Sequence, residues 1–462
     1  MWFLSTGAKP LWWLTWIAPL PVLLVAPRLS PRRAAAVGFV ASAIGGLNLL
    51  AVYPDVPAAL LLVVVVSIAI PGLVATWLWR VLDARSGPVA SVLTYPALVT
   101  ASEYAVSLIS PHGSFGSVAY SQADFLPLVQ IASLTGWTGV SFAVSLMPAA
   151  IAVAWNRRRA PRVRWLLPAA AFAVEVAALA VGALRLRGDG MRTKLTVGLA
   201  ASDTSSIHYG ATSAAEALSV LRQYAMRVEL LADSGAQVVV LPEKFVGVTS
   251  QYADSAIRVL GDVAARRHVT IVAGINRTEP APPRNVAVVL GPDGAVALNY
   301  SKVHLIGGLE QGYVPGNTAG TFLLGRNRAG VAICKDLDFP GFARRYASQG
   351  TELMLVPAWD FERDGWLHSR MAVMRGVEGG YAMARSATRG RLTVSDGYGR
   401  IVAERASSST AEPRLVTMVS AGPRETIYGR YGDWFPLLCA VVIAVTGCRR
   451  ASSSGRVMPG ST

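Results

Sequence analysis

Three side chains that are able to take part in covalent catalysis each stand close behind a short apolar run. VVVLPE ends at Glu243, ALNYSK ends at Lys302 and VAIC ends at Cys334. Such runs are typical of buried strands, so each side chain is expected at the rim of a sheet. A neighbouring base activates a thiol, and a nearby ammonium favours the thiolate and stabilises a tetrahedral oxyanion. The residues therefore predict acyl transfer or amide hydrolysis through a thioester on Cys334, with Glu243 as base and Lys302 as oxyanion stabiliser.

Other interpretations of this cysteine stay open at this point. His304 or His368 offers the base of a Cys–His pair, and a single cysteine at a strand end is more often an inert core residue. Three matched strand ends favour catalysis over that second interpretation. The other cysteines, Cys439 and Cys448, are too few for a disulfide framework. Thiolate chemistry needs no dissociable cofactor and the sequence has no ligand cluster, so we expect neither a cofactor nor a metal.

The elements that must position these residues are those of a layered α/β domain between residues 190 and 433. Residues 214–232 carry apolar side chains on one helical face, and the PDG at 292–294 is a hairpin signal. Mixed strand pairs with intervening helices are typical of layered α/β folds. The expected strands are 194–200, 236–243, 269–275, 285–291, 295–300, 329–334, 352–358 and 391–396.

The rest of the chain has the composition of a membrane protein. Apolar residues make up 52% of the 462 residues and charged residues 15%, well below the roughly 25% charged residues of soluble domains. This composition excludes disorder and makes an ordinary cytosolic enzyme a poor fit. Crossing the hydrocarbon takes about 20 apolar residues in a helix. We expect spans at 11–26 (the weakest, because it is short and contains proline), 34–53, 57–79, 89–109, 126–155, 165–184 and 434–447.

The net charge of +15 is concentrated in alternate loops between these runs. The loops near Asp55 and His112 hold no Lys or Arg, so the positive-inside rule places the basic loops in the cytoplasm. This explanation of the charge removes the main argument for nucleic-acid binding. We expect a membrane domain at 1–188, an extracytoplasmic catalytic domain at 189–433, a final span at 434–448 and a cytoplasmic tail at 449–462. The basic residues are Arg28, Arg32, Arg33, Arg80, Arg85, Arg157, Arg158, Arg159, Arg162, Arg164, Arg449 and Arg450.

Longer stretches around the three reactive residues resemble a known family. LPEKF, NYSKVHLIGGLEQGYVPG and VAICKDLDFP look like the Glu, Lys and Cys blocks of the nitrilase, or carbon–nitrogen hydrolase, superfamily. A helical bundle, such a domain and one last span is the layout of apolipoprotein N-acyltransferases. The stretches 101–106, 116–144, 370–390 and 428–438 also resemble that family. The resemblance implies a nitrilase-like α-β-β-α sandwich attached to a polytopic helical membrane bundle.

The resemblance also implies roles for further residues. Glu310, eight residues after Lys302, would hold the lysine or the base in place, and Asp336 stands where the family has a glutamate. Trp359, Asp360 and Arg385 are candidates for substrate binding, although a packed indole explains Trp359 equally well. Arg370, Arg375 and Glu378 would support the pocket or form a solvated helix face. The chain departs from the family where Lys335 follows the nucleophile and where Gly307, Gly308 and Leu309 precede Glu310.

The activity implied by the resemblance is transfer of an acyl chain from a phospholipid, through a Cys334 thioester, to the N-terminal amine of a diacylglyceryl-cysteine lipoprotein. The expected partners are that phospholipid, that lipoprotein and the bilayer of the bacterial cytoplasmic membrane, with no nucleic acid and a monomeric chain. Two alternatives remain: a membrane-tethered amidase that uses water as acceptor, and an inactive membrane scaffold. The altered residues around Cys334 and Glu310 leave the acyl acceptor open.

Two carboxylates lie within apolar runs, where a charged side chain is costly. An ionisable residue in such a run is therefore a candidate for a functional role. Glu103 and Glu175 are these residues, and Glu103 matches a glutamate of the family's central block. We interpret Glu103 as stabilising the bundle in preference to contacting substrate, because its span contains no cationic partner nearby.

Overall fold

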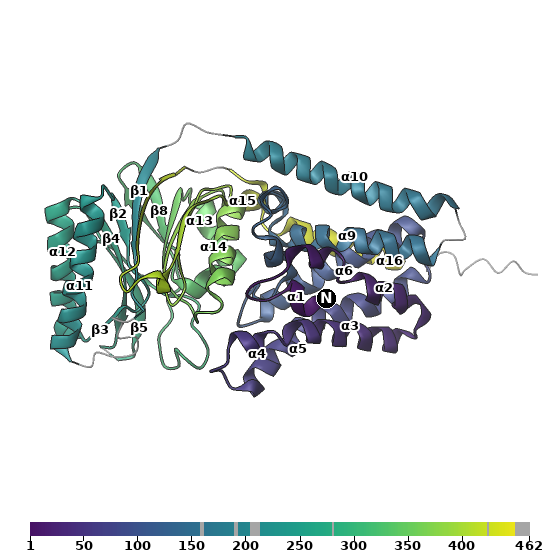
Figure 1. Cartoon of the computed structure of the whole chain (residues 1–462), viewed down its shortest axis with the longest axis horizontal. Coiled ribbons are helices and arrows are strands. Elements are labelled where there is room, and N and C mark those ends of the chain that lie inside the picture. The colour runs from purple at the N-terminus through teal and green to yellow at the C-terminus, as the bar shows by residue number, and fades with distance from the viewer. Residues whose placement is uncertain (158–160, 189–192, 204–212, 280, 423–424, 449–462) are drawn as a thin grey trace, which may run out of the picture. The chain divides into compact units, whose positions relative to one another are not determined.

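The computed structural model describes residues 1–157, 161–188, 193–203, 213–279, 281–422 and 425–448. The chain divides into two compact units. Figure 1 shows the chain coloured by residue number. Unit 1 combines Met1–Arg187 with Asp433–Thr462, and unit 2 is Gly188–Gly432. The expected cytoplasmic tail at 449–462, with Arg449 and Arg450, lies outside the described residues, as do Arg158 and Arg159.

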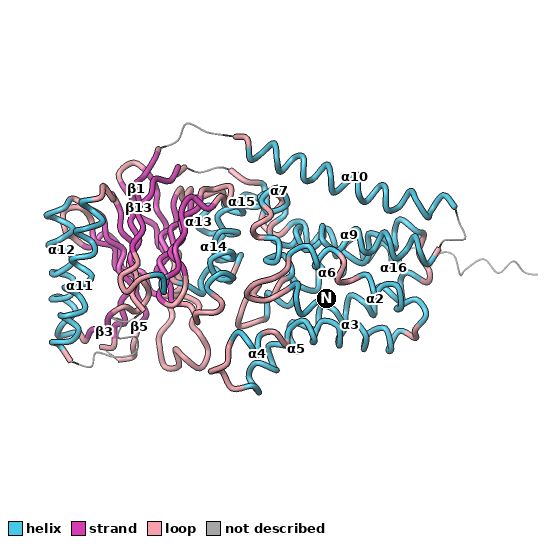
Figure 2. The backbone as a smooth tube through the Cα atoms, viewed as in Figure 1, coloured by secondary structure: helices cyan, strands magenta, loops and turns pink. Residues whose placement is uncertain are grey.

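Unit 1 is helical, as Figure 2 shows in cyan. In the described part of this unit, five helical segments are long and apolar enough to cross a membrane: Pro31–Val52, Ala58–Asp83, Pro88–Ile109, Trp137–Asn156 and Arg164–Leu186. This finding confirms the predicted helical membrane region. The helices are α1 (Trp2–Ser5), η1 (Trp12–Trp16), α2 (Leu20–Val25), η2 (Ala26–Arg28), α3 (Pro31–Gly46), α4 (Leu49–Val52), α5 (Ala58–Asp83), α6 (Pro88–Ile109), η3 (Val118–Gln122), α7 (Leu126–Val129), α8 (Ala132–Thr135), α9 (Trp137–Asn156), α10 (Pro161–Leu186) and α16 (Trp434–Cys448).

Two apolar runs do not form the single helices that were expected. The run 11–26 forms the short helices η1 and α2, because Pro19 and Pro21 supply no backbone N–H to continue the first turn. The run 126–155 is divided into α7, α8 and α9, and Gly136 separates the last two with a φ of 72°. The final apolar helix, α16, has 15 residues, fewer than a straight span needs.

Unit 2 contains two mixed β-sheets. In the first, the strand order is β13-β1-β2-β4-β5-β6 with β3 beside β4, and in the second it is β12-β11-β10-β9-β8-β7. Parallel pairs lie at the centre of each sheet and antiparallel pairs lie outside them. The strands are β1 (Lys194–Ala200), β2 (Val238–Val240), β3 (Val246–Val248), β4 (Thr270–Arg277), β5 (Arg284–Leu290), β6 (Val296–Ser301), β7 (Gly320–Leu324), β8 (Asn327–Val331), β9 (Leu353–Trp359), β10 (Ala382–Thr388), β11 (Arg391–Ser395), β12 (Ile401–Ala406) and β13 (Arg414–Ser420).

Helices cover the outer face of each sheet (Figure 1). α11 (Ala214–Asp233) and α12 (Ser250–Arg267) pack on the first sheet, and α14 (Gly365–Gly379) packs on the second beside α13 (Pro340–Ser348). One apolar cluster joins the inner faces of the two sheets, and another lies between the first sheet and its helices. The unit is therefore the predicted α-β-β-α sandwich. Its remaining helices are η4 (Cys334–Asp338), η5 (Ser407–Ser409) and α15 (Ile427–Tyr431).

A glycine allows the segment after β2 to pass close to β4. A Cβ added to Gly274 would lie 2.3 Å from the Pro242 carbonyl oxygen and 2.7 Å from Cα of Glu243. The amide of Glu243 donates to the Ala358 carbonyl at 3.2 Å, which links this segment to the end of β9 in the other sheet. The backbone of Glu243 is thus fixed between the two sheets. It packs so closely on β4 that position 274 has no room for a side chain.

We expect Gly274→Ala to lower the thermal unfolding midpoint and to disturb the position of Glu243. Overpacking of this kind costs about 1–3 kcal/mol, and the atoms that must move are backbone atoms. Thermal unfolding in detergent, with alkylation of Cys334 as a local readout, measures both effects. Gly341→Ala is the matched control, since a Cβ there meets nothing within 4 Å. Equal midpoints for the two variants would contradict this account.

Candidate active site

Four strand ends bring titratable side chains into one buried cluster in unit 2. Glu243 follows β2, Lys302 follows β6, Cys334 follows β8 and Asp360 follows β9. The ammonium Nζ of Lys302 lies 2.8 Å from Oε1 of Glu243 and 3.0 Å from Oε2 of Glu310. The side chain of Lys302 is fully buried. Three of the residues predicted from the sequence are therefore in direct contact.

The charges of this cluster stabilise one another against the cost of burial. Burial alone would lower the pKa of Lys302, but Glu243 and Glu310 outweigh it and raise that pKa above its usual value. Burial would raise the pKa of Glu310, but Lys302 and Lys244 hold it below its usual range. A buried charge is tolerated when it is paired and hydrogen-bonded. Lys302 is thus cationic and Glu310 anionic across the neutral pH range.

Two residues to which the sequence analysis gave no role complete the cluster. Lys244 donates to Oε1 of Glu310 at 2.9 Å, and the amide nitrogen of Asn285 lies 2.6 Å from carboxylate oxygens of both Glu243 and Glu310. Lys244 adopts a φ of 48°, which turns the chain immediately after Glu243. The signals available were the lysine inside LPEKF and a polar residue at the start of a strand that is otherwise apolar.

The other carboxylate oxygen of Glu243 has no hydrogen-bond partner among the described residues. This buried atom is Oε2, whereas Oε1 accepts from both Lys302 and Asn285. Of the three N–H bonds of the Lys302 ammonium, two are directed at carboxylates. The cluster therefore retains one carboxylate oxygen able to accept a proton and one ammonium N–H able to donate a hydrogen bond.

Cys334 lies at a sharp turn between β8 and the 3-10 helix η4. Its φ is 43°, in the left-handed region that costs a residue with a side chain about 1–2 kcal/mol. The thiol Sγ donates to the Trp359 carbonyl at 3.4 Å. Burial and the carboxylate of Glu243 raise the pKa of Cys334 well above its usual range, while the cations Lys302 and Arg385 oppose that rise. The resting sulfur is therefore a thiol, and its ionisation requires a base.

The two histidines that offered an alternative base have other partners. His304 Nδ1 lies 3.2 Å from Oδ1 of Asp336, and its ring stacks on Phe339 at 3.7 Å between centroids. His368 Nε2 lies 3.1 Å from a carboxylate oxygen of Asp364. Burial alone would lower the pKa of His368, but Asp364 and Asp338 raise it well above the usual value. An imidazolium of this kind has no lone pair with which to accept a thiol proton.

Asp336 links the segment after Lys302 to the segment that carries Cys334. Its carboxylate accepts from the hydroxyl of Tyr300 at 2.6 Å and from the amide of Ile333 at 3.0 Å. It also accepts from the amides of Val303 at 3.1 Å and His304 at 2.8 Å. These bonds join the ends of β6 and β8. Asp336 therefore holds backbone from both segments in place.

Two of the predicted substrate-binding residues form an ion pair with each other. Arg385 forms two hydrogen bonds with Asp360, and both side chains are buried. Trp359 contributes its carbonyl to the thiol, and its ring lies 5.7 Å from Nζ of Lys244. Lys335, which departs from the family pattern, donates to the Leu305 carbonyl at 3.3 Å. Burial lowers the pKa of Lys335.

The arginines of the α14 block are also paired. Arg370 donates to Glu404 at 2.6 Å, and Arg375 lies 3.2 Å from Glu378. Arg370, Arg375 and Glu378 are all buried, so this block is not a solvated helix face. Its charges support the packing of α14 on the second sheet.

Each of the two units contains a region that matches the model of a known protein family. Residues 1–150 match the model of the apolipoprotein N-acyltransferase N-terminal domain, and residues 200–429 match that of carbon–nitrogen hydrolases. The chain is 25% identical to an apolipoprotein N-acyltransferase of Geobacter metallireducens, over 97% of this chain and 93% of that protein. It is 27% identical to one of Bradyrhizobium diazoefficiens, over 72% of this chain and 68% of that protein.

Solved structures with a similar fold include a mutant amidase from Nesterenkonia sp. In that structure acrylamide has added to the active-site cysteine. The likeness has a TM-score of 0.40 and 22% sequence identity, and covers 48% of this chain and 92% of the amidase chain.

The rate at which iodoacetamide alkylates Cys334 is expected to keep rising with pH beyond the usual titration range of a thiol, about 8.5. The reason is its raised pKa. Glu243→Gln removes a neighbouring anion and should therefore shift this profile to lower pH. Intact-mass kinetics in a Cys439→Ala, Cys448→Ala background measure the shift, and Glu362→Gln, at an exposed ion pair, is the control. A plateau near pH 8.5, or a profile that Glu243→Gln leaves in place, would contradict the description.

Proposed function

Because this chain belongs to the apolipoprotein N-acyltransferase family, we propose that Cys334 carries an acyl chain from a phospholipid to the α-amine of a lipidated N-terminal cysteine. The observation that carries this proposal is the buried Glu243–Lys302 pair, whose charges act on the thiol of Cys334 at a strand-to-helix turn. The membrane helices of unit 1 support it, because both substrates are lipids that reside in a bilayer.

In the first half-reaction, Glu243 takes the proton of the Cys334 thiol through its unpartnered oxygen. The thiolate attacks the ester carbonyl of the phospholipid, and the remaining N–H of Lys302 stabilises the oxyanion of the tetrahedral intermediate. The intermediate collapses when the ester C–O bond breaks. The departing lysophospholipid alkoxide receives the proton from Glu243, and the acyl chain stays on Cys334 as a thioester.

In the second half-reaction, the neutral α-amine of the acceptor attacks the thioester carbonyl. Lys302 again stabilises the oxyanion, and Glu243 accepts the proton that the amine loses. The C–S bond breaks, an amide forms, and the leaving thiolate of Cys334 takes the proton from Glu243. The lysophospholipid therefore leaves before the acceptor amine reacts, which is a ping-pong sequence.

The neighbouring residues act in this scheme as positioning residues. Glu310 and Lys244 hold the ammonium of Lys302 in a neutral cluster. Asp336 ties the backbone just before the thiol to the segment that follows Lys302. Arg385 adds positive potential at the sulfur, balanced by Asp360. A membrane-tethered amidase would use the same residues with water as acceptor. The match of residues 1–150 to the family's N-terminal domain favours the amine acceptor over water.

We further propose that unit 2 faces the extracytoplasmic side of the bacterial cytoplasmic membrane. The basic residues of the short loops between the apolar runs all fall in alternate loops, which the positive-inside rule assigns to the cytoplasm. Lipoprotein acceptors exported through this membrane would then meet the thioester on the side where unit 2 lies. No nucleic acid or cofactor enters this scheme, and we expect the chain to act as a monomer.

Intact-mass analysis after incubation with phospholipid vesicles should detect an acyl adduct on Cys334. Cys334→Ser should form none, because an alkoxide needs far more activation than a thiolate, whereas Cys448→Ala should load normally. Glu243→Gln is expected to form no adduct at neutral pH, a loss of about 100-fold or more, with partial recovery at higher pH as the thiol ionises unaided. Transfer by Cys334→Ser, or loading of Glu243→Gln at the wild-type rate, would overturn the mechanism.

Compartment reporters test the orientation. Fusions after residues 160 and 300 should report opposite compartments, with the first in the cytoplasm, because one apolar run lies between them. A further fusion after residue 110 serves as a control and should agree with the fusion after 300. Cytoplasmic signals from both of the main fusions would contradict the proposed topology.

A further inference from the structure

Glu103 of α6 accepts hydrogen bonds from three donors. Ser141 of α9 donates to Oε2 at 2.6 Å, Ser117 donates to the same oxygen at 2.8 Å, and the amide of Val118 donates to Oε1 at 3.1 Å. The hydroxyl oxygen of Ser117 also accepts from the amide of Ala119 at 3.1 Å and lies 3.3 Å from the hydroxyl of Ser141. The surroundings thus supply donors to both oxygens of the side chain.

These partners satisfy the hydrogen bonds of Glu103 but not its charge. Within the described residues, no Lys, Arg or His forms an ion pair with Glu103. A charge without a partner in a membrane helix costs several kcal/mol. A glutamine side chain would accept hydrogen bonds without this cost, so bundle stability alone does not explain a glutamate here.

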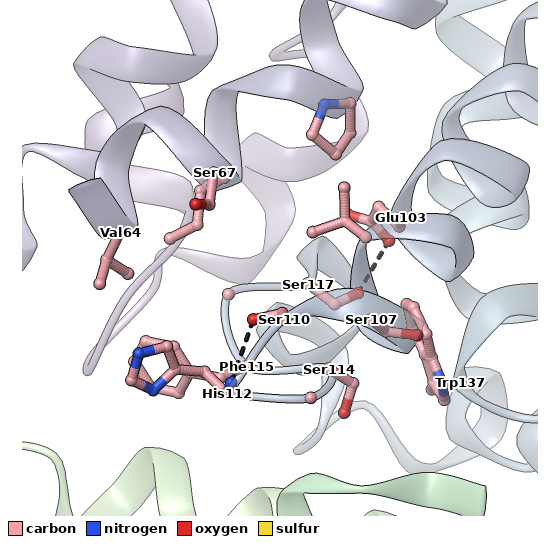
Figure 3. Close-up of a pocket in the computed structure, with 15 residues that line it drawn as sticks. Val64, Ser67, Glu103, Ser107, Ser110, His112, Ser114, Phe115, Ser117 and Trp137 are labelled. Carbon is pink, nitrogen blue, oxygen red and sulfur yellow. Dashed lines mark hydrogen bonds between the residues drawn. The ribbon is translucent and has the colours of Figure 1, made fainter. Parts of the chain in front are cut away.

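The carboxylate lies at two pockets of unit 1, one of which Figure 3 shows. Ser67 and Pro71 of α5 line that pocket from one side, and His112 and Phe115 line it from the segment after α6. Gly116, with a φ of 86°, brings this segment against α5, since an added Cβ would lie 2.8 Å from Cδ1 of Ile68. The pocket therefore combines hydroxyl groups and aromatic rings with the carboxyl group of Glu103, which forms no ion pair within the described residues.

The pocket lies at a depth that suits a lipid headgroup. Glu103 is six residues before the end of α6 at Ile109, about 9 Å along the helix axis at 1.5 Å per residue. The segment that follows, residues 110–117, contains no Lys or Arg, so the positive-inside rule assigns it to the extracytoplasmic side. Glu103 would then lie within the leaflet that faces the same compartment as unit 2.

We propose that the pocket shown in Figure 3, called here the Glu103 pocket, binds the primary ammonium group of a lipid substrate. An ammonium supplies the missing positive charge and N–H donors for the carboxylate, and its acyl chains can remain in the bilayer. Two substrates of the proposed reaction present such a group. One is a phospholipid donor with an ethanolamine headgroup, and the other is the lipidated acceptor, whose α-ammonium would leave the pocket and lose a proton before the amine attacks the thioester. The inference rests on the proposed function only in naming these lipids as substrates of Cys334.

The test uses the full-length protein with Glu103→Gln, which removes the charge and preserves the shape of the side chain. Glu175→Gln is the matched control, because Glu175 is a carboxylate on α10 that lines neither pocket. Loading of Cys334 is followed by intact mass with vesicles of phosphatidylethanolamine or phosphatidylglycerol that carry the same acyl chains. Transfer to a synthetic diacylglyceryl-cysteine peptide is then followed from the loaded enzyme.

If the ammonium belongs to the donor, Glu103→Gln should slow loading from phosphatidylethanolamine about tenfold, the effect of roughly 1.4 kcal/mol, and leave phosphatidylglycerol unchanged. If it belongs to the acceptor, both lipids should load normally and transfer to the peptide should slow by a similar factor. Glu103→Asp, which keeps the charge, should retain part of the affected rate, and Glu175→Gln should retain all of it. Equal losses from both donor lipids, or no loss in either step, would overturn the proposal.

Lipid retention separates this inference from the catalytic one. In a Cys334→Ser background, which forms no thioester, native mass spectrometry should show that Glu103→Gln reduces retention of phosphatidylethanolamine or of the lipopeptide relative to phosphatidylglycerol. This result would support the pocket even if the wild-type protein formed no acyl adduct, an outcome that would refute the proposed function alone. Unchanged retention of all three lipids would refute the pocket alone.

Discussion

The Lys302 ammonium between two buried carboxylates is the interaction on which the catalytic unit depends. Glu243 and Glu310 both contact it at 3.0 Å or less, and Lys244 neutralises the second carboxylate. Two anions and two cations thus form a cluster without net charge. Removal of any one member would leave an uncompensated charge in the core, which typically costs about 3–5 kcal/mol. The cluster therefore constrains the ends of β2, β6 and the segment that carries Glu310 at the same time.

The fold satisfies this constraint by delivering the charged residues from strand ends of two sheets. The strand β2 is apolar and buried throughout, and β4 is buried except at its last residue, so charged side chains are found where these strands stop. The close approach at Gly274 and the bond from Glu243 to Ala358 fix one side of the cluster. Asp336 fixes the other side by holding four donors from two segments. The reactive geometry is thus a consequence of sheet packing, with backbone hydrogen bonds at each end.

The sequence predicted which residues lie at strand ends, but it did not predict the contacts between those residues. The apolar runs before Glu243, Lys302 and Cys334 predicted their positions because burial of a strand leaves a strong local pattern. Asn285 and Lys244 were missed because their roles depend on pairing across strands and on a backbone turn, and neither leaves such a pattern. The strand β10 was also not predicted separately, since its Arg385 and Ser386 are buried polar residues. In the membrane unit, two prolines divided a run that hydropathy alone predicted as one helix.

The two units treat a buried carboxylate in opposite ways. In unit 2, each carboxylate of the cluster has a cation within hydrogen-bond distance. In the proposed mechanism, this pairing would keep the charges fixed while a proton moves between Glu243 and the sulfur. In unit 1, Glu103 has hydroxyl and amide donors but no cation in the described residues. A paired charge is suited to chemistry, because its environment already compensates it before the substrate arrives. An unpaired charge is suited to binding, because the ligand itself supplies the compensation and the affinity comes from relieving that cost.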